Sequence, residues 1–381
     1  MRKGFLAAAL LGVALQPAQP SAPARATNVI LFLADAGGIP TINAASIHGY
    51  GAPRHLFVQH MPQIGLSETS TALEFVSDSA AGMTAIVTGQ KTRNEVISQS
   101  ASAVPGQRDG KDLKSILDYA EEHGLATGFV TNDWATGATP AALYAKINSR
   151  RKTGEIFLQL FHPAFGDGVD VAIASGHQEI EAALKPLGRG YDDIERTTHR
   201  KVLSSVADIP KGARRAIVLY DTEEFDHLAA VQTAIQVLSR SPRGYFLMVE
   251  EDVHTDRIKR GLDRMVAFDK EIRQISGTVG KNTLVLFTAD HSFDIRTHDG
   301  QWGEPLLAGL PAGEGMDKSA DSERLPNVWM DNSHTGEEVL VAAQGPGAER
   351  VHGYMANTDL FGVMMRAYGW PVPPAPTIGR Q

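Results

Sequence analysis

The chain of 381 residues is predicted to form a single α/β domain, in which helices cover both faces of a central, mostly parallel sheet. Runs of apolar and β-branched residues with the length of buried strands alternate along the chain with amphipathic segments of helical period. Neither an internal repeat nor a break in composition divides the chain after residue 26. Hydrophobic residues make up 43% of the sequence, an ordinary share for a globular protein with a sizeable core.

The first 26 residues have the features of a secretory signal peptide. Arg2 and Lys3 precede the apolar run 5–15, and residues 24–26 are Ala-Arg-Ala, a small-residue cleavage pattern. The apolar run is too short to be a permanent membrane span. We therefore expect a mature domain of residues 27–381 that is periplasmic or secreted.

The composition excludes several kinds of partner and site. The formal net charge is -8 and no basic run interrupts the sequence, so we expect no nucleic-acid partner. The chain contains no cysteine, which excludes disulfides, thiolate chemistry and cysteine-based zinc sites. Any metal ion must therefore be held by histidine, carboxylate and hydroxyl ligands.

Residues 28–34 form the first predicted strand, an uninterrupted apolar run suited to burial on both faces of a parallel sheet. The run ends at Asp35 and is followed by Gly37 and Gly38. Open α/β sheets place their sites at the carboxyl ends of such strands. Asp35 is therefore a candidate site residue, and the alternative is a turn-forming role ahead of the next helix.

Residues 76–92 contain the candidate nucleophile. An Ala- and Thr-rich segment that begins at Ser79 is predicted to run as a helix to Thr88, where Gly89 is a natural stop. Free N–H groups and the dipole at a helix N-terminus stabilise a serine oxygen that becomes negative and then carries a phosphoryl group. The alternative is that Ser79 is only the helix cap.

Helices and strands are expected to alternate between residues 113 and 239. The patterns predict helices at 113–123, 155–163, 179–187 and 228–239 and strands at 127–131, 169–173 and 215–220. One more helix is predicted with Thr139 as its cap and Pro140 in its first position, reaching residues 149–151. Thr139 and Arg150 lie at opposite ends of this segment, so both reach one site only if the chain folds back.

Polar residues begin abruptly at the end of the strand that starts at Tyr245. Side chains alternate in an extended chain, so Glu250, Asp252 and His254 are predicted to project from one face. Three such side chains on one edge indicate half of a metal site. A charged, solvated strand end is the alternative.

A long helix at 260–279 is expected to lead into a strand at 283–288, which is followed by Asp290 and His291. A sharp turn after a buried strand can aim an adjacent acid and imidazole at one ion. This dipeptide is therefore a candidate chelating pair.

Residues 292–333 lack apolar periodicity and are rich in Gly, Pro and Asp, which predicts a long excursion over the site. The chain returns at 333–337, which contains His334. A strand at 339–343 and a closing helix at 358–368 are expected to follow.

Taken in order, these stretches resemble the alkaline phosphatase family, and the resemblance extends over most of the chain after the predicted leader. The matching stretches are Asn28 to Asp35, Asp78-Ser79-Ala80-Ala81, Ala138-Thr139-Pro140-Ala141-Ala142, Ser149-Arg150, Thr288-Ala289-Asp290-His291 and His334-Thr335-Gly336-Glu337. The resemblance implies that family's α/β fold. It also implies metal-dependent hydrolysis of phosphate monoesters through a phosphoserine intermediate, with release of inorganic phosphate.

Carried over residue by residue, the resemblance implies two zinc ions beside Ser79, the nucleophile that becomes phosphorylated. Asp35, Asp290 and His291 would bind the zinc that meets the Ser79 hydroxyl and lowers its pKa. His334 would bind the second zinc, which serves the hydrolysis of the phosphoserine.

The resemblance also implies one magnesium ion and a phosphate-binding arginine. Thr139, Asp35 and an acid from the 250 region would hold Mg²⁺, and the planar fork of Arg150 would grip two phosphate oxygens. Family members carry Asp or His at the position of Gly137, so the outer surroundings of this ion differ here. The expected partners are small phosphomonoester substrates, and a homodimer is compatible with the resemblance.

The 250 region departs from the family pattern of a Glu, an Asp five residues later and a His four residues beyond that. Glu251 and Asp256 keep the first interval, but an arginine, which cannot bind zinc, stands where the histidine would be. The alternative is a shortened loop in which Asp252 and His254 bind the second zinc and Glu250 binds magnesium. We prefer this alternative because it keeps a histidine in the site, and Asp256 stays as the rival ligand.

Two other functions compete with monoester hydrolysis. A phosphodiesterase or nucleotide pyrophosphatase on the same scaffold is one, although such relatives commonly use a Thr nucleophile and an apolar pocket in place of the arginine. Ser79 and Arg150 therefore favour monoesters. The other is a secreted metal- or phosphate-binding protein without catalysis, suggested by the missing histidine in the 250 region.

Overall fold

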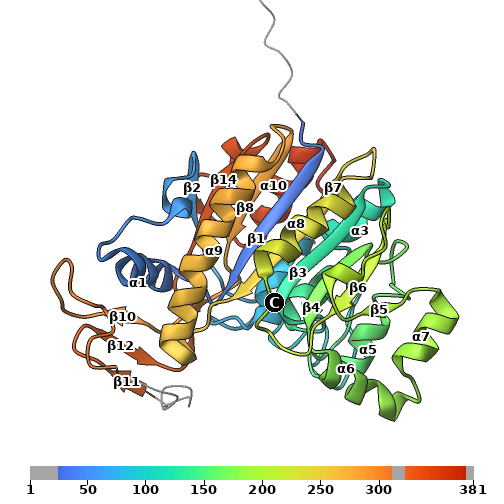
Figure 1. The fold of residues 1–381 in the computed structure, drawn as a ribbon, viewed down its shortest axis with the longest axis horizontal. Coiled ribbons are helices and arrows are strands. Elements are labelled where there is room, and N and C mark those ends of the chain that lie inside the picture. The colour runs from blue at the N-terminus through green and yellow to red at the C-terminus, as the bar shows by residue number, and fades with distance from the viewer. Residues whose placement is uncertain (1–24, 311–321, 375–381) are drawn as a thin grey trace, which may run out of the picture.

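The computed structural model describes residues 25–310 and 322–374. These residues form an α/β domain around a ten-stranded sheet, with helices on both faces (Figure 1). The sheet order is β15-β2-β14-β8-β1-β7-β3-β4-β6-β5. Within it, β14 runs antiparallel to its two neighbours and the other pairings are parallel. The predicted fold class is confirmed.

The strands of the large sheet are β1 (Asn28–Asp35), β2 (Gln63–Ser67), β3 (Ala126–Trp134), β4 (Val171–Ser175), β5 (Val202–Leu203), β6 (Ala216–Leu219), β7 (Tyr245–Asp252), β8 (Thr283–Thr288), β14 (Val339–Gln344) and β15 (Gly353–Met355). The apolar run of β1 lies between β7 and β8 and is buried. These three strands are parallel, so their carboxyl ends meet at one edge of the sheet. There Asp35 is the register partner of Asp252.

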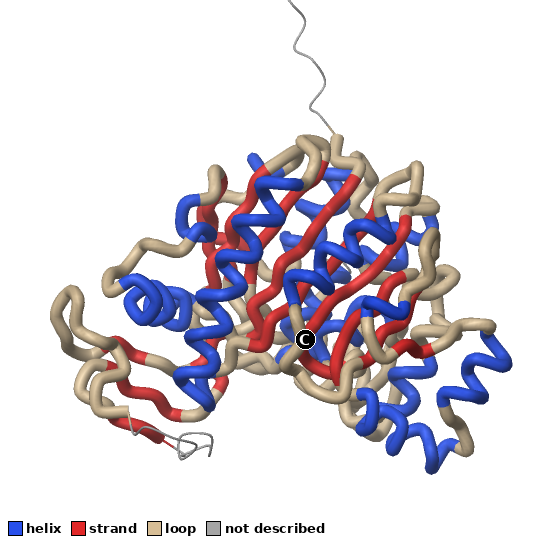
Figure 2. The backbone as a smooth tube through the Cα atoms, in the orientation of Figure 1, coloured by secondary structure: helices blue, strands red, loops and turns tan. Residues whose placement is uncertain are grey.

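Two apolar layers cover the sheet, because successive side chains of a strand point to opposite faces. Val29 and Leu31 of β1 belong to one layer, and Ile30 and Phe32 belong to the other. The first layer includes residues of α2 (Ser79–Thr88), α3 (Ile116–Glu122), α4 (Ala138–Tyr144), α5 (Thr153–Leu158), α6 (His177–Leu184), α7 (Tyr191–Thr198) and α10 (Asp359–Tyr368). The second includes residues of α1 (Ile39–Tyr50), α8 (His227–Leu238) and α9 (Ile258–Thr278). Figure 2 shows α8 and α9 crossing the strands on the near face.

The helix predicted from Thr139 to residues 149–151 is wrong at both ends. Gly137 is the N-cap residue of α4, and the helix ends at Tyr144, after which the backbone is extended. The physical reason lies far away in the sequence, because Ile147 forms a β-bridge with Ile97 through hydrogen bonds of 2.9 and 3.0 Å. The backbone groups that a longer helix would use are thus bonded to another loop.

The predicted excursion at 292–333 contains short strands that the sequence did not indicate. They are β9 (Ser292–Phe293), β10 (Arg296–Thr297), β11 (Ser322–Arg324) and β12 (Val328–Asp331), and β9 pairs with β13 (His334–Thr335). Strands β10, β12 and β11 form a small separate sheet. The pairing of β9 with β13 returns the chain to the end of β8.

The predicted signal peptide lies outside the described residues except for Arg25 and Ala26. In the ranges 25–310 and 322–374, no helix combines the length and the apolar character needed to cross a membrane.

Candidate active site

The candidate site lies where β1, β7 and β8 end. Asp35 is the last residue of β1, Asp290 and His291 follow β8, and His254 comes two residues after β7. Strand β13 adds His334 from the other side. Among the described residues, the possible ligand atoms form two groups, each within 4.8 Å: one of Asp35, Asp290 and His291, and one of His254, His291 and His334. The structure thus brings together side chains from four distant segments.

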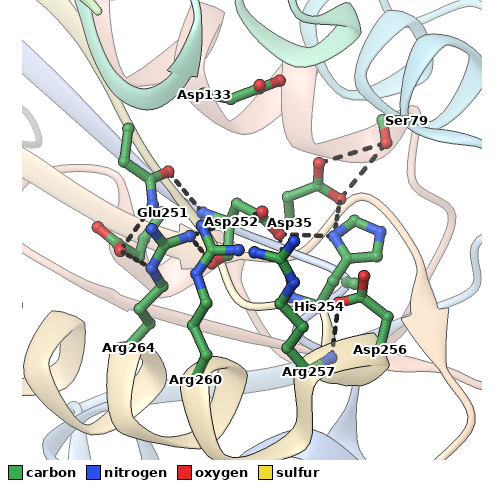
Figure 3. A network of polar contacts seen from close by, with 12 residues as sticks. Asp35, Ser79, Asp133, Glu251, Asp252, His254, Asp256, Arg257, Arg260 and Arg264 are labelled. Carbon is green, nitrogen blue, oxygen red and sulfur yellow. Dashed lines mark hydrogen bonds and ion pairs between the residues drawn. The ribbon is translucent and has the colours of Figure 1, made fainter. Parts of the chain in front are cut away.

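Ser79 is the first residue of α2 and faces this cluster. Its hydroxyl oxygen lies 3.4 Å from each carboxylate oxygen of Asp35 (Figure 3). It also lies 3.1 Å from Nε2 of His291. The capping role belongs to Asp78, whose Oδ1 accepts a hydrogen bond of 2.9 Å from the Ala81 N–H. Ser79 is therefore not the residue that caps α2, which was the alternative to its role as the nucleophile.

Asp290 and His291 are held in fixed orientations at the end of β8. Nδ1 of His291 donates to the Ser292 carbonyl at 3.1 Å, so its Nε2 faces the cluster, 3.2 Å from Oδ1 of Asp35. Oδ1 of Asp290 accepts from the His291 N–H at 3.0 Å, while its buried Oδ2 has no hydrogen-bond partner. Burial, and then the charge of Asp35, raise the pKa of Asp290 to about 6. The site is crowded with negative charge.

His254 and His334 complete the second group. The carbonyl of Ser77 accepts a 3.0 Å hydrogen bond from Nδ1 of His334, whose ring stacks on His291 with centroids 4.0 Å apart. Burial and the charges of the neighbouring imidazoles lower the pKa of His334 to about 4, so the ring is neutral, as a metal ligand must be.

Asp252 orients His254 from one side of its ring. Its Oδ1 lies 2.7 Å from Nδ1 of His254, which is also 3.9 Å from Asp35. Burial disfavours the charge of His254, but Asp35 and Asp252 outweigh it and raise its pKa to about 10. Burial opposes the charge of Asp35, but the charges of His254, His291 and Arg150, together with the hydrogen bond from His291, outweigh it and lower the pKa of that carboxyl.

The two alternatives for the 250 region differ in where the structure places their acids. Glu250 is fully buried beside Asp35. Glu251 accepts a hydrogen bond of 2.8 Å from Asn132 and lies 3.6 Å from Arg264 (Figure 3). Both of these partners also contact Asp252. In the described part of the chain, His254 belongs to a candidate metal group, whereas none of the acids at positions 250, 251, 252 and 256 does. This placement favours His254 as the histidine that the 250 region supplies. Asp252 is the acid in direct contact with it, at 2.7 Å.

A third group of oxygen atoms surrounds Glu250. Burial, and then the charges of Asp35 and Asp133, raise its pKa well above the usual range. Both of its carboxylate oxygens and the hydroxyl of Thr139 lack a hydrogen bond of ordinary geometry in the described structure, although Thr131 and Thr139 lie close enough to lower this pKa. Buried polar groups without partners are costly, so this cradle suits a hard divalent cation.

The sequence analysis missed Asp133, which is near this cradle. Burial, and then the charges of Asp252 and Asp35, raise its pKa to about 7. Asp133 lies near the carboxyl end of β3, next to β7, so the strand-end argument that selected Asp35 also applies to it. It was missed because the predicted strand stopped two residues earlier, at Thr131.

Arg150 approaches the nucleophile because the chain folds back after α4. Its Nη1 lies 3.3 Å from Oδ2 of Asp78, the residue before Ser79. The Arg150 N–H donates to the Glu95 carbonyl at 2.9 Å, which fixes the segment beside the start of α2. A guanidinium is thus held at the start of α2, in contact with the residue before Ser79.

Comparisons with known proteins agree with this geometry. The family model for alkaline phosphatase matches residues 26–168 and 223–303. Alkaline phosphatase 4 of Drosophila melanogaster is 24% identical over 90% of this chain and 76% of its own length. Streptomycin-6-phosphate phosphatase of Streptomyces griseus is 28% identical over 97% of each chain.

Solved structures share the fold. The alkaline phosphatase of Thermus thermophilus superposes with a TM-score of 0.73 at 19% identity, covering 95% of this chain and 96% of that one. A variant of the TAB5 alkaline phosphatase gives a TM-score of 0.73 at 22% identity, covering 92% of this chain and 100% of that one. Because the family model matches more than half of the sequence, this chain belongs to the alkaline phosphatase family.

Proposed function

We propose that this protein hydrolyses phosphate monoesters through a phosphoserine at Ser79 and releases inorganic phosphate. The observation that carries the proposal is the position of the Ser79 hydroxyl. It stands at the N-terminus of α2, 3.1 Å from Nε2 of His291 and 3.4 Å from both oxygens of Asp35. A nucleophile in this place can be activated by bound cations without a separate histidine base.

The donor sets fit two zinc ions and one magnesium ion. Imidazole nitrogens mixed with carboxylate oxygens suit zinc, and an all-oxygen set suits magnesium. The proposed sets are Asp35, Asp290 and His291 for the first zinc, Asp252, His254 and His334 for the second, and Asp35, Thr139 and Glu250 for magnesium. The partnerless oxygens of Asp290 and Glu250 support this fit. When bound, the zinc ions would lower the pKa of the serine hydroxyl and neutralise charge on the transferred group.

The remaining tasks belong to the protein's own groups. The free N–H groups and the dipole of α2 stabilise negative charge at Ser79. Asp78 positions Arg150, whose planar guanidinium can donate two parallel hydrogen bonds to phosphate oxygens. Asp252 orients the imidazole of His254 by their 2.7 Å contact.

The relatives and the predicted leader support finer parts of the proposal. Several relatives are named alkaline phosphatases, and the Streptomyces griseus relative is named for streptomycin-6-phosphate, a phosphorylated small molecule. Two TAB5 variants hold Mg in the site named M3. The leader pattern supports export, so we infer that small phosphate esters outside the cytoplasm are the substrates.

Labelling at Ser79 tests the central step. We expect a short incubation with a phosphorylated substrate to label Ser79 and Ser79→Ala to abolish both label and turnover while the metal content is unchanged. His254→Ala should lose about one zinc ion per chain. A protein that binds zinc and phosphate but is never labelled would instead be the non-catalytic relative, and full zinc retention in His254→Ala would shift the ligand to Asp256.

Arg150 distinguishes monoesters from diesters. A monoester dianion carries one more charge for the guanidinium than a diester of the same alcohol. We expect the wild type to prefer the monoester and Arg150→Met to lose most of that preference in kcat/KM. A wild type that prefers the diester would favour the phosphodiesterase alternative.

A further inference from the structure

Gly137 and Asp133 occupy adjacent space in the turn between β3 and α4. A Cβ atom at Gly137 would lie 2.2 Å from Oδ2 of Asp133 and 3.1 Å from its Cγ. The backbone at Gly137 has φ -51° and ψ 151°, which any residue adopts. Position 137 is therefore a glycine for steric and not for conformational reasons. The Asp133 carboxylate occupies the space that a side chain at this position would need.

Asp133 lies in an irregular stretch at the end of β3. Pairing between β3 and β4 is regular up to Val130, shifts register, and resumes at Trp134. Within this irregular stretch the Asp133 N–H donates to the Thr131 hydroxyl at 2.9 Å. The charges of Asp35, Asp252 and Arg150 all act on the Asp133 carboxylate. Figure 3 draws this carboxylate above Asp35 and Asp252.

The groups near this carboxylate lack partners. Glu250 is 0% exposed and Thr139 is 1% exposed. The two carboxylate oxygens of Glu250 and the hydroxyl of Thr139 have no hydrogen bond of ordinary geometry in the described structure, although Thr131 and Thr139 lie close to Glu250. The charges of Asp35 and Asp133 act on the Glu250 carboxylate, so negative charge is in excess around it. Such a set of hard oxygen donors with excess negative charge is suited to Mg²⁺.

We propose that Asp133 supplies, from the end of β3, the outer acid of the magnesium site that family members supply from the position of Gly137. This inference rests on the proposed function, because the cradle is that function's third metal site. It adds that Gly137 and Asp133 act as a pair: the missing side chain at one position makes room for the carboxylate at the other. The outer acid of the site would therefore come from the end of β3, whereas in family members it comes from the start of the helix that corresponds to α4.

Magnesium titration of the zinc-loaded protein by calorimetry tests the pair. Removing an outer-shell acid typically weakens metal affinity about 10- to 100-fold, so we expect this loss in Asp133→Ala and a smaller loss in Asp133→Asn. Gly137→Ala should cause a similar loss, because its methyl group pushes the Asp133 carboxylate aside. Adding Gly137→Ala to Asp133→Ala should cause no further loss.

The decisive variant moves the acid to the other position. Gly137→Asp alone should bind magnesium poorly because the two side chains clash, whereas Asp133→Ala combined with Gly137→Asp should recover most of the wild-type affinity. Gly190→Ala is the matched control: Gly190 is also a helix N-cap with allowed φ, but a Cβ there meets nothing within 4 Å. It should leave magnesium affinity unchanged.

The outcomes separate this inference from the function on which it rests. Unchanged magnesium affinity in Asp133→Ala, or no recovery in the combined variant, overturns the inference if zinc content and Ser79 labelling are normal. A wild-type protein that takes up no zinc and is never labelled overturns the proposed function as well. Normal zinc content in each variant shows that a loss of magnesium is not a loss of folding.

Discussion

Gly82 is the position where α2 touches the end of β8, and replacing it should disturb the candidate site. A Cβ atom at Gly82 would lie 2.5 Å from the backbone carbonyl oxygen of Asp290, about 0.9 Å short of ordinary contact. The obstacle is backbone, so it cannot rotate away. Gly82→Ala must therefore push α2, with Ser79 at its start, away from Asp290. A misplacement of about 1 Å in a reacting group can cost about 100-fold in rate.

An ordinary Gly→Ala substitution inside a helix stabilises a protein, whereas we expect Gly82→Ala to lower both the stability and the rate. Gly→Ala gains about 1 kcal/mol of helix propensity, while overpacking costs about 1–3 kcal/mol. We expect Gly82→Ala to lose about 0–2 kcal/mol in the free energy of unfolding, measured with urea. Its kcat on a chromogenic phosphate monoester should fall about 10- to 100-fold.

Gly277 in α9 provides the matched control, because a Cβ there meets nothing within 4 Å. Gly277→Ala should raise the free energy of unfolding by about 0.5–1 kcal/mol and leave kcat unchanged. Full turnover in Gly82→Ala, together with a gain in stability like that of Gly277→Ala, would refute the claim that α2 rests on the backbone of Asp290.

Three further predictions concern stability. Lys146 and Asp118 form a 2.8 Å ion pair in which both side chains are 1% exposed. Lys146→Met leaves the Asp118 charge buried without its partner, so it should lower the free energy of unfolding in urea by about 3–5 kcal/mol. Adding Asp118→Asn should recover part of this loss. Burial disfavours the charge of His227, but two neighbouring glutamates raise its pKa to about 9. The stability that this charge contributes should be complete below about pH 6.5 and lost as the pH rises through about 9. In His227→Gln, the urea midpoint of unfolding should therefore change less with pH over that range than in the wild type. Chelation of divalent ions should lower the melting temperature by an amount that grows as the pH rises from about 3.8, the ordinary pKa of an aspartate, to about 6, the pKa of Asp290 in the metal-free fold, and is constant above that. An equal drop at pH 5 and pH 8 would contradict this.

The parts of the fold that local sequence determines were predicted well. The strand at 283–288 agrees with β8 because an uninterrupted apolar run can be buried on both faces of a parallel sheet. Helix α2 ends at Thr88 because Gly89 takes the left-handed conformation, with φ 70°. The acids and imidazoles that follow these strands were predicted by the same local argument, since the ends of parallel strands meet at one edge.

The parts that depend on distant contacts were not predictable. The end of α4 is set by the bridge between Ile97 and Ile147, 50 residues apart, and no local pattern indicates it. Asp133 depends on an irregularity in the pairing of β3 and on the space at Gly137. Both are properties of packing, which composition and periodicity do not report.

The changed spacing in the 250 region has a physical basis in how α9 begins. A Cβ at Gly261 would lie 2.3 Å from the carbonyl oxygen of His254, so glycine lets the first turn of α9 pack directly on the loop that carries this histidine. Arg264, one turn later, donates to the Asp252 carbonyl at 3.4 Å, and Arg260 pairs with Glu223. Arg260, which stands where the resemblance places a histidine, is therefore engaged in an ion pair. In the assignment that we propose, the ligands of the 250 region lie at the end of β7, where Asp252 is the register partner of Asp35. A two-residue step from Asp252 then brings the imidazole of His254 to that strand end without any contribution from the helix.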